Sequence, residues 1–222
     1  MTMPQQPVCA IAGMGPGVGL AVARRFGTEG FRIAMLARRA ERLADFEKEL
    51  GAAGIAARGY PVDLADEPRL RGVFQRIEAE LAAPAVLVYN ASSGHVGRPT
   101  SLGEAAFIGD FRINAVAPVW CVQEVLDGMM EAGRGTVLLT GGGLALEPQA
   151  DLASLSIGKA AIRSLAYSLA NELEPAGIHV ATVTICGFVR EGTHFAPDRI
   201  AGEFWRLHAQ EPGEFQTEVV YK

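Results

Sequence analysis

The chain has 222 residues, of which 49% are hydrophobic and 20% charged, and 20 Lys and Arg against 25 Asp and Glu give a formal net charge of -5. A net acidic chain lacks the basic surface that nucleic acid requires, so we expect no nucleic-acid partner. Domains most often have about 100 to 150 residues, but α/β domains run longer. One domain over residues 1–222 is therefore expected.

The cysteines and the N-terminal residues bear on the compartment. Cys9, Cys121 and Cys186 are odd in number, widely spaced and set among apolar neighbours, which indicates reduced thiols rather than a disulfide framework. Residues 1–7 contain no basic segment followed by an apolar stretch, and no later run approaches the roughly 18 apolar residues of a membrane span. We expect a cytoplasmic protein without membrane contact or a metal site.

Apolar runs of strand length alternate along the chain with segments of helical spacing. The expected strands are Val8–Ala12, Arg32–Ala37, Ala57–Val62, Ala85–Asn90, Thr136–Thr140, Val180–Ile185 and a short final Glu218–Tyr221. Repeated strand and helix units predict a parallel sheet, and right-handed crossovers place helices on both of its faces. The expected architecture is a single-domain, Rossmann-like, doubly wound α/β fold with about seven strands.

A glycine-rich loop follows the first expected strand and opens a helix near Val18. It reads Ala12-Gly13-Met14-Gly15-Pro16-Gly17-Val18-Gly19. Glycines permit a tight turn and close backbone approach, and a helix N-terminus offers free N–H groups to a pyrophosphate. The predicted contacts are Gly13, Gly15, Gly17, Val18 and Gly19. The alternative is a tight strand-to-helix turn without a ligand, since Pro16 has no N–H to donate.

The ends of the next three expected strands carry polar side chains. Arg38 and Arg39 follow the second strand, where an acid would bind the ribose of NAD and a basic group would meet the 2'-phosphate of NADP. NADP is favoured, with NAD possible, unless both arginines are solvated charges at the start of a helix. Asp63 and Asn90 follow the third and fourth strands, either at the ligand-binding edge of the sheet or as ordinary turn residues.

With the glycine loop, Asp63, Asn90-Ala91, Asn114 and Lys159 in this order, the chain resembles the short-chain dehydrogenase/reductase family over nearly its whole length. The family's glycine pattern matches at Gly13, Gly17 and Gly19, and its Asn-Asn-Ala-Gly element is present as Tyr89-Asn90-Ala91-Ser92. The resemblance implies that Asn90 lies near the adenosine ribose and Asp63 beside the adenine. It also implies that Lys159 contacts the nicotinamide ribose and that Ile185-Cys186-Gly187 lies near the nicotinamide, which makes Gly187 a cofactor-binding residue.

The family's catalytic residues are Asn, Ser, Tyr and Lys, of which this chain keeps Asn114 and Lys159. By the same resemblance, Leu155 stands at the tyrosine position and the serine position falls in Gly141-Gly142-Gly143. In ordinary members the lysine lowers the tyrosine pKa from about 10, so that the phenol can pass a proton while hydride moves at the nicotinamide. Leucine cannot exchange a proton.

Two loop histidines are candidate replacement acids, because His95 follows the fourth expected strand and His194 the sixth. Solvent-facing side chains are the alternative for both. Ser154 and Ser156 flank Leu155 but lie about 100 degrees around the helix from it, so neither replaces a side chain at that position. Asn114 has a structural alternative too, as a buried residue that bonds backbone.

Three functions remain open from the sequence. The first is an NADP-dependent oxidoreductase of unknown substrate, with a proton from water, substrate or a loop histidine. The second is a catalytically silent dinucleotide-binding protein or regulatory subunit, and the third is a fold that has lost the nucleotide. The resemblance implies a homodimer or homotetramer packed through helices around Ala115–Met130 and Leu155–Leu173. The short segment Phe188–Arg199 predicts a small or open substrate cleft.

Overall fold

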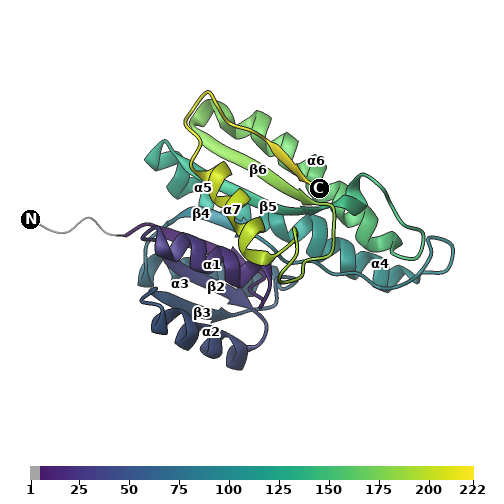
Figure 1. Cartoon of the computed structure of the whole chain (residues 1–222), viewed down its shortest axis with the longest axis horizontal. Helices are drawn as coiled ribbons and strands as arrows, with labels where there is room; N and C mark the ends of the chain where they lie inside the picture. Colours follow the sequence, from purple (N-terminus) through teal and green to yellow (C-terminus); the bar gives the residue numbers. More distant parts are fainter. Residues whose placement is uncertain (1–5) are drawn as a thin grey trace, which may run out of the picture.

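The computed structural model describes residues 6–222 and contains one seven-stranded parallel sheet (Figure 1). The strands are β1 (Val8–Ala12), β2 (Arg32–Ala37), β3 (Ala57–Pro61), β4 (Pro84–Tyr89), β5 (Gly135–Gly142), β6 (Ile178–Ile185) and β7 (Glu218–Tyr221). Their order is β3-β2-β1-β4-β5-β6-β7. The predicted Rossmann-like α/β fold is confirmed, and the order reverses direction between β1 and β4, where such folds bind their ligands.

Helices cover both faces of the sheet. One face packs against α1 (Val18–Thr28), α2 (Ala40–Ala52) and α7 (Pro197–His208). The other face packs against α3 (Glu67–Glu80), α5 (Ala117–Ala132) and α6 (Ala153–Leu173). Successive strand residues point to opposite faces, so Cys9 and Ile11 of β1 enter the first core while Val8 and Ala10 enter the second. This double burial explains why β1 and β6 are apolar or small at nearly every position.

The helix before β5 is interrupted by a π-helical turn. It begins as α4 (Glu104–Phe111), passes through the π turn Arg112–Val116 and continues as α5. Sequence periodicity did not predict the interruption, because one extra residue in a turn hardly alters an apolar pattern. Such π turns often lie at functional sites, and this one holds Asn114, which is buried.

Among residues 6–222, one helical run, Glu104–Ala132, is long and apolar enough to cross a membrane by length and composition alone. The sequence expectation concerned an unbroken apolar run, and in this helix Asp110 and Arg112 interrupt the apolar residues. The finding is weak support for membrane contact, since core helices of soluble proteins pass the same test. Cys121, Val125 and Met129 of this run pack into the core beneath the sheet.

Strand ends differ slightly from the sequence expectation. β5 runs on through Gly141 and Gly142, which pair with Thr184 and Ile185 of β6. Glycine lacks the side chain that signals a strand, so the expected end at Thr140 was too early. β3 and β4 stop one residue before Val62 and Asn90 respectively, which places Asn90 in the loop beyond the sheet.

Candidate functional site

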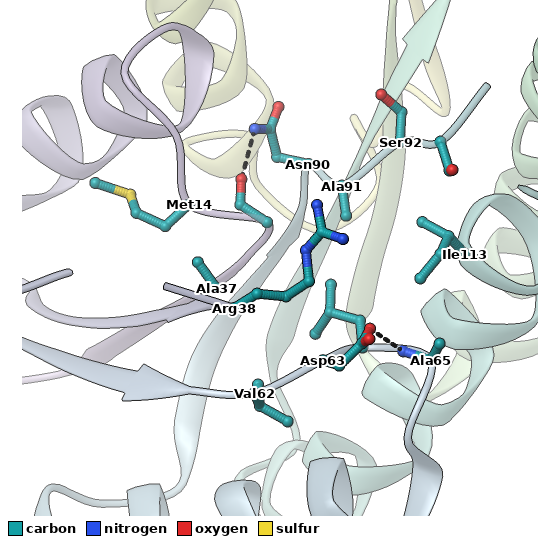
Figure 2. A pocket seen from close by; sticks show the side chains of 13 residues that line it. Met14, Ala37, Arg38, Val62, Asp63, Ala65, Asn90, Ala91, Ser92 and Ile113 are labelled. Atoms are coloured by element: carbon teal, nitrogen blue, oxygen red, sulfur yellow. Dashed lines mark hydrogen bonds between the residues drawn. The ribbon is translucent and has the colours of Figure 1, made fainter. Parts of the chain in front are cut away.

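A cavity of about 430 Å³ lies at the carboxyl ends of the first four strands. Its walls come from the loops after β1, β2, β3 and β4 and from the π turn (Figure 2). The lining residues are Gly13, Met14, Ala37, Arg38, Val62, Asp63, Leu64, Ala65, Asn90, Ala91, Ser92, Ser93 and Ile113. Four predicted cofactor-binding positions from separate loops, at Gly13, Arg38, Asp63 and Asn90, are thus brought to one cavity together with Ala91.

The turn at Gly13 requires a glycine. Its φ is +92°, and an added Cβ would lie 2.3 Å from the Ala91 nitrogen. The N–H groups of Gly13 and Met14 donate to the Leu36 carbonyl at 2.9 and 3.0 Å. The Asn90 amide nitrogen donates to the Gly13 carbonyl at 3.0 Å, and the Thr140 hydroxyl donates to Asn90 Oδ1 at 3.0 Å. Asn90 therefore fastens the loop after β1 to the ends of β4 and β5.

The rest of the glycine loop lies above the cavity and leads into α1. Gly17 is the N-cap residue, no side chain caps the helix, and Val18 is its first residue. The space beside Gly15 is open, whereas a Cβ at Gly19 would lie 3.3 Å from the Asn90 amide nitrogen. The α1 N-terminus thus presents backbone and its positive dipole end to an anion. Gly15, Gly17, Val18 and Gly19 do not line the cavity itself.

The two arginines after β2 lie in different places. Arg38 extends into the cavity (Figure 2). Arg39 is the exposed N-cap residue of α2 and is absent from the cavity wall. Asp63 also lines the cavity, where its carboxylate accepts from the Ala65 N–H at 3.0 Å and forms a turn. The cavity wall therefore contains one guanidinium and one carboxylate, which follow the neighbouring strands β2 and β3.

A second cavity, of about 540 Å³, lies beyond β5 and β6. Its walls are mostly glycine and apolar side chains, among them Leu144, Leu146, Leu152 and Phe188. Gly187 lines it as well, and a Cβ there would collide with the Phe195 ring at 2.3 Å. Only a short segment separates β6 from α7, and Phe188 within it is 95% exposed, so this cleft has no closed lid.

Lys159 lines the second cavity from α6. Its Nζ donates to the Thr140 carbonyl at 2.8 Å. Burial lowers the lysine pKa to about 8, because the charged ammonium loses its hydration. The lysine stem runs beside Gly142, where an added Cβ would lie 3.4 Å from it. Lys159 therefore loses its proton more readily than an exposed lysine does, and it lines a largely apolar cavity.

Asn114 lies outside both cavities and bonds only backbone among the described residues. Its Oδ1 accepts from the Ser93 N–H at 2.9 Å, and its Nδ2 donates to the Ser93 carbonyl at 2.6 Å. Gly158 of α6 packs so closely that a Cβ there would lie 2.5 Å from the Asn114 side chain. Asn114 therefore fixes the loop after β4 against α6, as its structural alternative predicted.

The two candidate histidines differ in their surroundings. His194 stacks on Tyr221, with ring centroids 4.5 Å apart, and lines neither cavity. His95 lies on the loop after β4, and its Nδ1 is 3.0 Å from both carboxylate oxygens of the buried Asp110. Sequence reasoning missed Asp110. The sequence feature that pointed to Asp110 was an acidic residue within an apolar helical stretch, one turn before Asn114.

Comparison with known proteins places this geometry in a family. Residues 7–199 match the family model described as short chain dehydrogenase. Oxidoreductase asL5 of Sarocladium schorii is 30% identical over 204 residues, which cover 90% of this chain and 78% of that protein. The 2,3-dihydro-2,3-dihydroxybenzoate dehydrogenase of Bacillus subtilis is 27% identical over 210 residues, covering 95% of this chain and 76% of that enzyme.

A solved structure agrees with the sequence comparisons. A metagenomic short-chain oxidoreductase in complex with NADP superposes with a TM-score of 0.90 at 28% identity, covering 97% of this chain and 96% of that one. The sheet order, the glycine turn at the first crossover and the lysine of α6 are features that the family resemblance implied. The chain therefore belongs to the short-chain dehydrogenase/reductase family of NAD(P)-dependent oxidoreductases.

Proposed function

We propose that this protein is an NADP(H)-dependent oxidoreductase that interconverts an apolar carbonyl compound and its alcohol through a proton donor other than tyrosine. The observation that carries the proposal is Arg38, which enters the first cavity at the strand end where an NAD-binding member would place an acid. The similar metagenomic oxidoreductase was solved with NADP, which supports the same cofactor here.

The residues present fit a dinucleotide. Gly13 lets the loop pass directly against Ala91, where a Cβ would collide, and the open flank of Gly15 leads to the N-terminus of α1. Arg38, Asp63 and Asn90 would hold the adenosine end in the first cavity. Lys159 and Gly187 would hold the nicotinamide end in the second. When bound, the cofactor supplies or accepts hydride, and the chain's own groups bind, orient and exchange the proton.

The correspondence of Leu155 with the family's tyrosine is part of the proposal. Leu155 lies one turn before Lys159 on the same face of α6, which is the spacing of the family's tyrosine and lysine. Of the three glycines in the serine region, Gly141 has its side-chain space filled by threonine hydroxyls at 2.8 Å, and Gly143 meets Cys186 Cα at 3.0 Å. Gly142 alone has ordinary room, so we assign it the serine position.

The second cavity indicates the substrate class. Leucine side chains and Phe188 line most of it, and its polar groups are Glu147, Gln149, Lys159 and Lys222. An apolar ketone or alcohol fits the leucine and phenylalanine walls, because these side chains cannot replace the hydration of a charge. Without a closed lid the cleft can accept a substrate that extends into solvent.

The cofactor assignment is tested by calorimetry with NADPH and NADH. Arg38→Ala removes a charge-assisted contact to the 2'-phosphate, so NADPH binding is expected to weaken about tenfold to hundredfold while NADH binding stays within about twofold. Arg39→Ala is the matched control, since Arg39 lies outside the cavity wall. Equal loss in both variants, or equal affinity of the parent for the two nucleotides, contradicts the 2'-phosphate contact.

Hydride exchange with a panel of carbonyl substrates separates the proposal from the first alternative, and the nucleotide titration separates it from the second. A protein that binds NADPH yet never exchanges hydride with any carbonyl substrate is the catalytically silent binder. A protein that gives neither heat nor thermal stabilisation with NADPH or NADH has kept the fold without the ligand, as Pro16 in the loop would allow.

A further inference from the structure

A buried carboxylate lies beside the loop that crosses the start of α6. Asp110 is fully buried. Its carboxylate accepts hydrogen bonds from the hydroxyls of Ser93 and Ser154, both at 2.6 Å, and from the backbone N–H of His95 at 2.8 Å. Burial alone would raise its pKa, but the hydrogen bonds from Ser154, Ser93 and His95 outweigh it and lower the pKa to about 2. Asp110 is therefore ionised at neutral pH.

His95 is the one ion-pairing partner of Asp110 within residues 6–222. Its Nδ1 lies 3.0 Å from both carboxylate oxygens, whereas its side chain as a whole is 59% exposed. A carboxylate acceptor at Nδ1 fixes the proton on that nitrogen and orients the ring, and it leaves Nε2 to exchange a proton with another molecule. The buried Asp110 carboxylate thus holds the His95 imidazole at Nδ1, and Nε2 belongs to a side chain that is largely exposed.

The loop that carries His95 packs on the residues where the family's acid would stand. A Cβ at Gly94 would lie 2.9 Å from Leu155 Cβ. The Gly97 N–H donates to the Asp151 carbonyl at 2.9 Å, and Ala153 N–H donates to the Gly97 carbonyl at 3.4 Å. These two backbone hydrogen bonds therefore hold the loop against the first turn of α6. His95 itself lines neither cavity, whereas Ser93, two residues before it, lines the first and Leu152, just before α6, lines the second.

Other charged groups near the loop that carries His95 are paired with groups other than His95. On the same loop and just before α6, Arg98 and Asp151 pair with each other at 2.9 Å. From one turn further along α6, the Lys159 ammonium donates to the Thr140 carbonyl. On α4 the charge that faces His95 is Asp110. The Asp110 carboxylate is thus the charged group in contact with the imidazole.

We infer that His95, oriented by Asp110, is the proton donor that replaces the missing tyrosine. The inference rests on the proposed oxidoreductase function. In the reduction direction the carbonyl carbon gains hydride from the reduced dinucleotide, and the carbonyl oxygen gains the proton from Nε2 of the imidazolium. The N–H bond breaks, the former carbonyl π electrons form the new O–H bond, and a neutral imidazole remains on Asp110. His95 is the catalytic residue, and Asp110 is its positioning residue.

The first test is kinetic and uses NADPH with 2-tetralone, an apolar bicyclic ketone, as the probe. His95→Gln is expected to lower kcat by about a hundredfold to ten-thousandfold, with NADPH affinity and KM within about threefold of the parent. The parent kcat should fall with rising pH, because the donor must carry its proton, and the variant should lack that limb. His194→Gln is the matched control and should change neither kcat nor the pH profile, because His194 stacks on Tyr221.

Two further variants separate chemistry from loop structure. Ser154→Ala removes one hydrogen bond to Asp110 without touching His95, and it should leave kcat within about threefold of the parent. Leu155→Tyr added to His95→Gln returns a phenol to the family position beside Lys159, and it should restore most of the lost kcat. A variant that has merely lost its fold would not be rescued in this way.

The second test does not depend on turnover. ¹⁵N chemical shifts of the neutral imidazoles report which ring nitrogen carries the proton, and His95→Gln assigns the His95 signals. The parent should show the Nδ1–H form at His95, and Asp110→Asn should lose that preference. An Nε2–H form in the parent, or an unchanged kcat and pH profile in His95→Gln, overturns the inference. Absence of NADPH binding in the parent, seen by calorimetry beforehand, instead sinks the proposed function, and the inference falls with it.

Discussion

Lys159 shows at the scale of one residue how burial prepares a functional group. Its ammonium is removed from water with one neutral acceptor, the Thr140 carbonyl, and its pKa falls to about 8. A cofactor hydroxyl offers a further acceptor at that point, so ligand binding and the charge of Lys159 are linked. The lysine costs stability in the free protein, a trade that is common at binding sites.

The stability cost of burying the Lys159 ammonium should make the free energy of unfolding depend on pH. Between pH 8 and 10.5 the unfolded chain holds the lysine proton more tightly than the folded one, so the free energy of unfolding rises with pH. Measured by urea unfolding, the free energy of unfolding of the parent should rise between pH 8 and 10.5 by on the order of 2 to 3 kcal/mol more than that of Lys159→Met. Lys48→Met on the exposed face of α2 is the control and should run parallel to the parent. A constant difference between parent and Lys159→Met would contradict the buried ammonium.

Sequence reasoning located residues that line the cavities but not the partners that hold them. Gly13, Arg38 and Asp63 were predictable because each follows a strand, and the carboxyl ends of parallel strands meet at one edge. Arg39 was grouped with Arg38, although it faces away from the cavity wall at the α2 N-cap. An acid within an apolar helical stretch marked Asp110 as unusual, but no periodicity shows that it meets a loop fifteen positions earlier.

At the scale of elements, α7 is joined to α1 by a cluster of aromatic rings around one histidine. His208 lies 5.3 Å from the rings of Phe26 and Phe31 and 5.2 Å from Trp205, and its Nδ1 is 2.9 Å from the Thr136 hydroxyl. Burial, together with the charge of His179, lowers the His208 pKa to about 4. The helix pair is thus packed around a neutral imidazole.

The packing of α7 should therefore weaken in mild acid. The stability that neutral His208 contributes is present above pH 6.5 and is lost as pH falls toward 4, because the unfolded chain takes up the proton first. Between pH 7 and 4 the parent should lose on the order of 2 kcal/mol more unfolding free energy than His208→Gln. His194→Gln, at an exposed ring, should follow the parent, and equal acid sensitivity of all three proteins would count against this account.

The elements themselves were largely predictable, with one exception. Strand runs and helical spacing indicated the sheet and its crossovers, because burial on both faces leaves long apolar runs. The π turn between α4 and α5 was not predictable, and it is what brings Asn114 against Gly158 and Ser93. A local irregularity in the helix therefore determines the position of the loop that carries His95.

At the scale of the whole molecule, apolar side chains remain exposed on two neighbouring helical faces. Ile108, Phe111 and Met130 are 56%, 40% and 50% exposed on α4 and α5, and Ile157 and Tyr167 are 42% and 41% exposed on α6. Exposed large apolar side chains on helix faces are the kind of surface that protein interfaces cover. We propose that these faces pack in a homodimer or homotetramer, as the family resemblance implied.

The assembly is tested by light scattering at micromolar concentration. The parent should show a multiple of the 23.5 kDa chain mass, and the double variant Ile108→Glu, Phe111→Glu should shift toward that mass. Val96→Glu is the control, since Val96 is 82% exposed on the loop after β4 and lies off both helices. A monomeric parent, or an equal shift in the control, contradicts an interface on α4 and α5.

In the proposed complex one dinucleotide spans both cavities, with its 2'-phosphate on Arg38 and its nicotinamide beside Lys159 and His95. A crystal structure of the complex with NADPH tests this arrangement. The phosphate oxygens are expected within hydrogen-bond distance of the Arg38 guanidinium, the nicotinamide ribose on Lys159 Nζ, and His95 Nε2 facing the open side of the nicotinamide ring. Density for the dinucleotide with its nicotinamide remote from Lys159 and His95, or a 2'-phosphate directed away from Arg38, would contradict it.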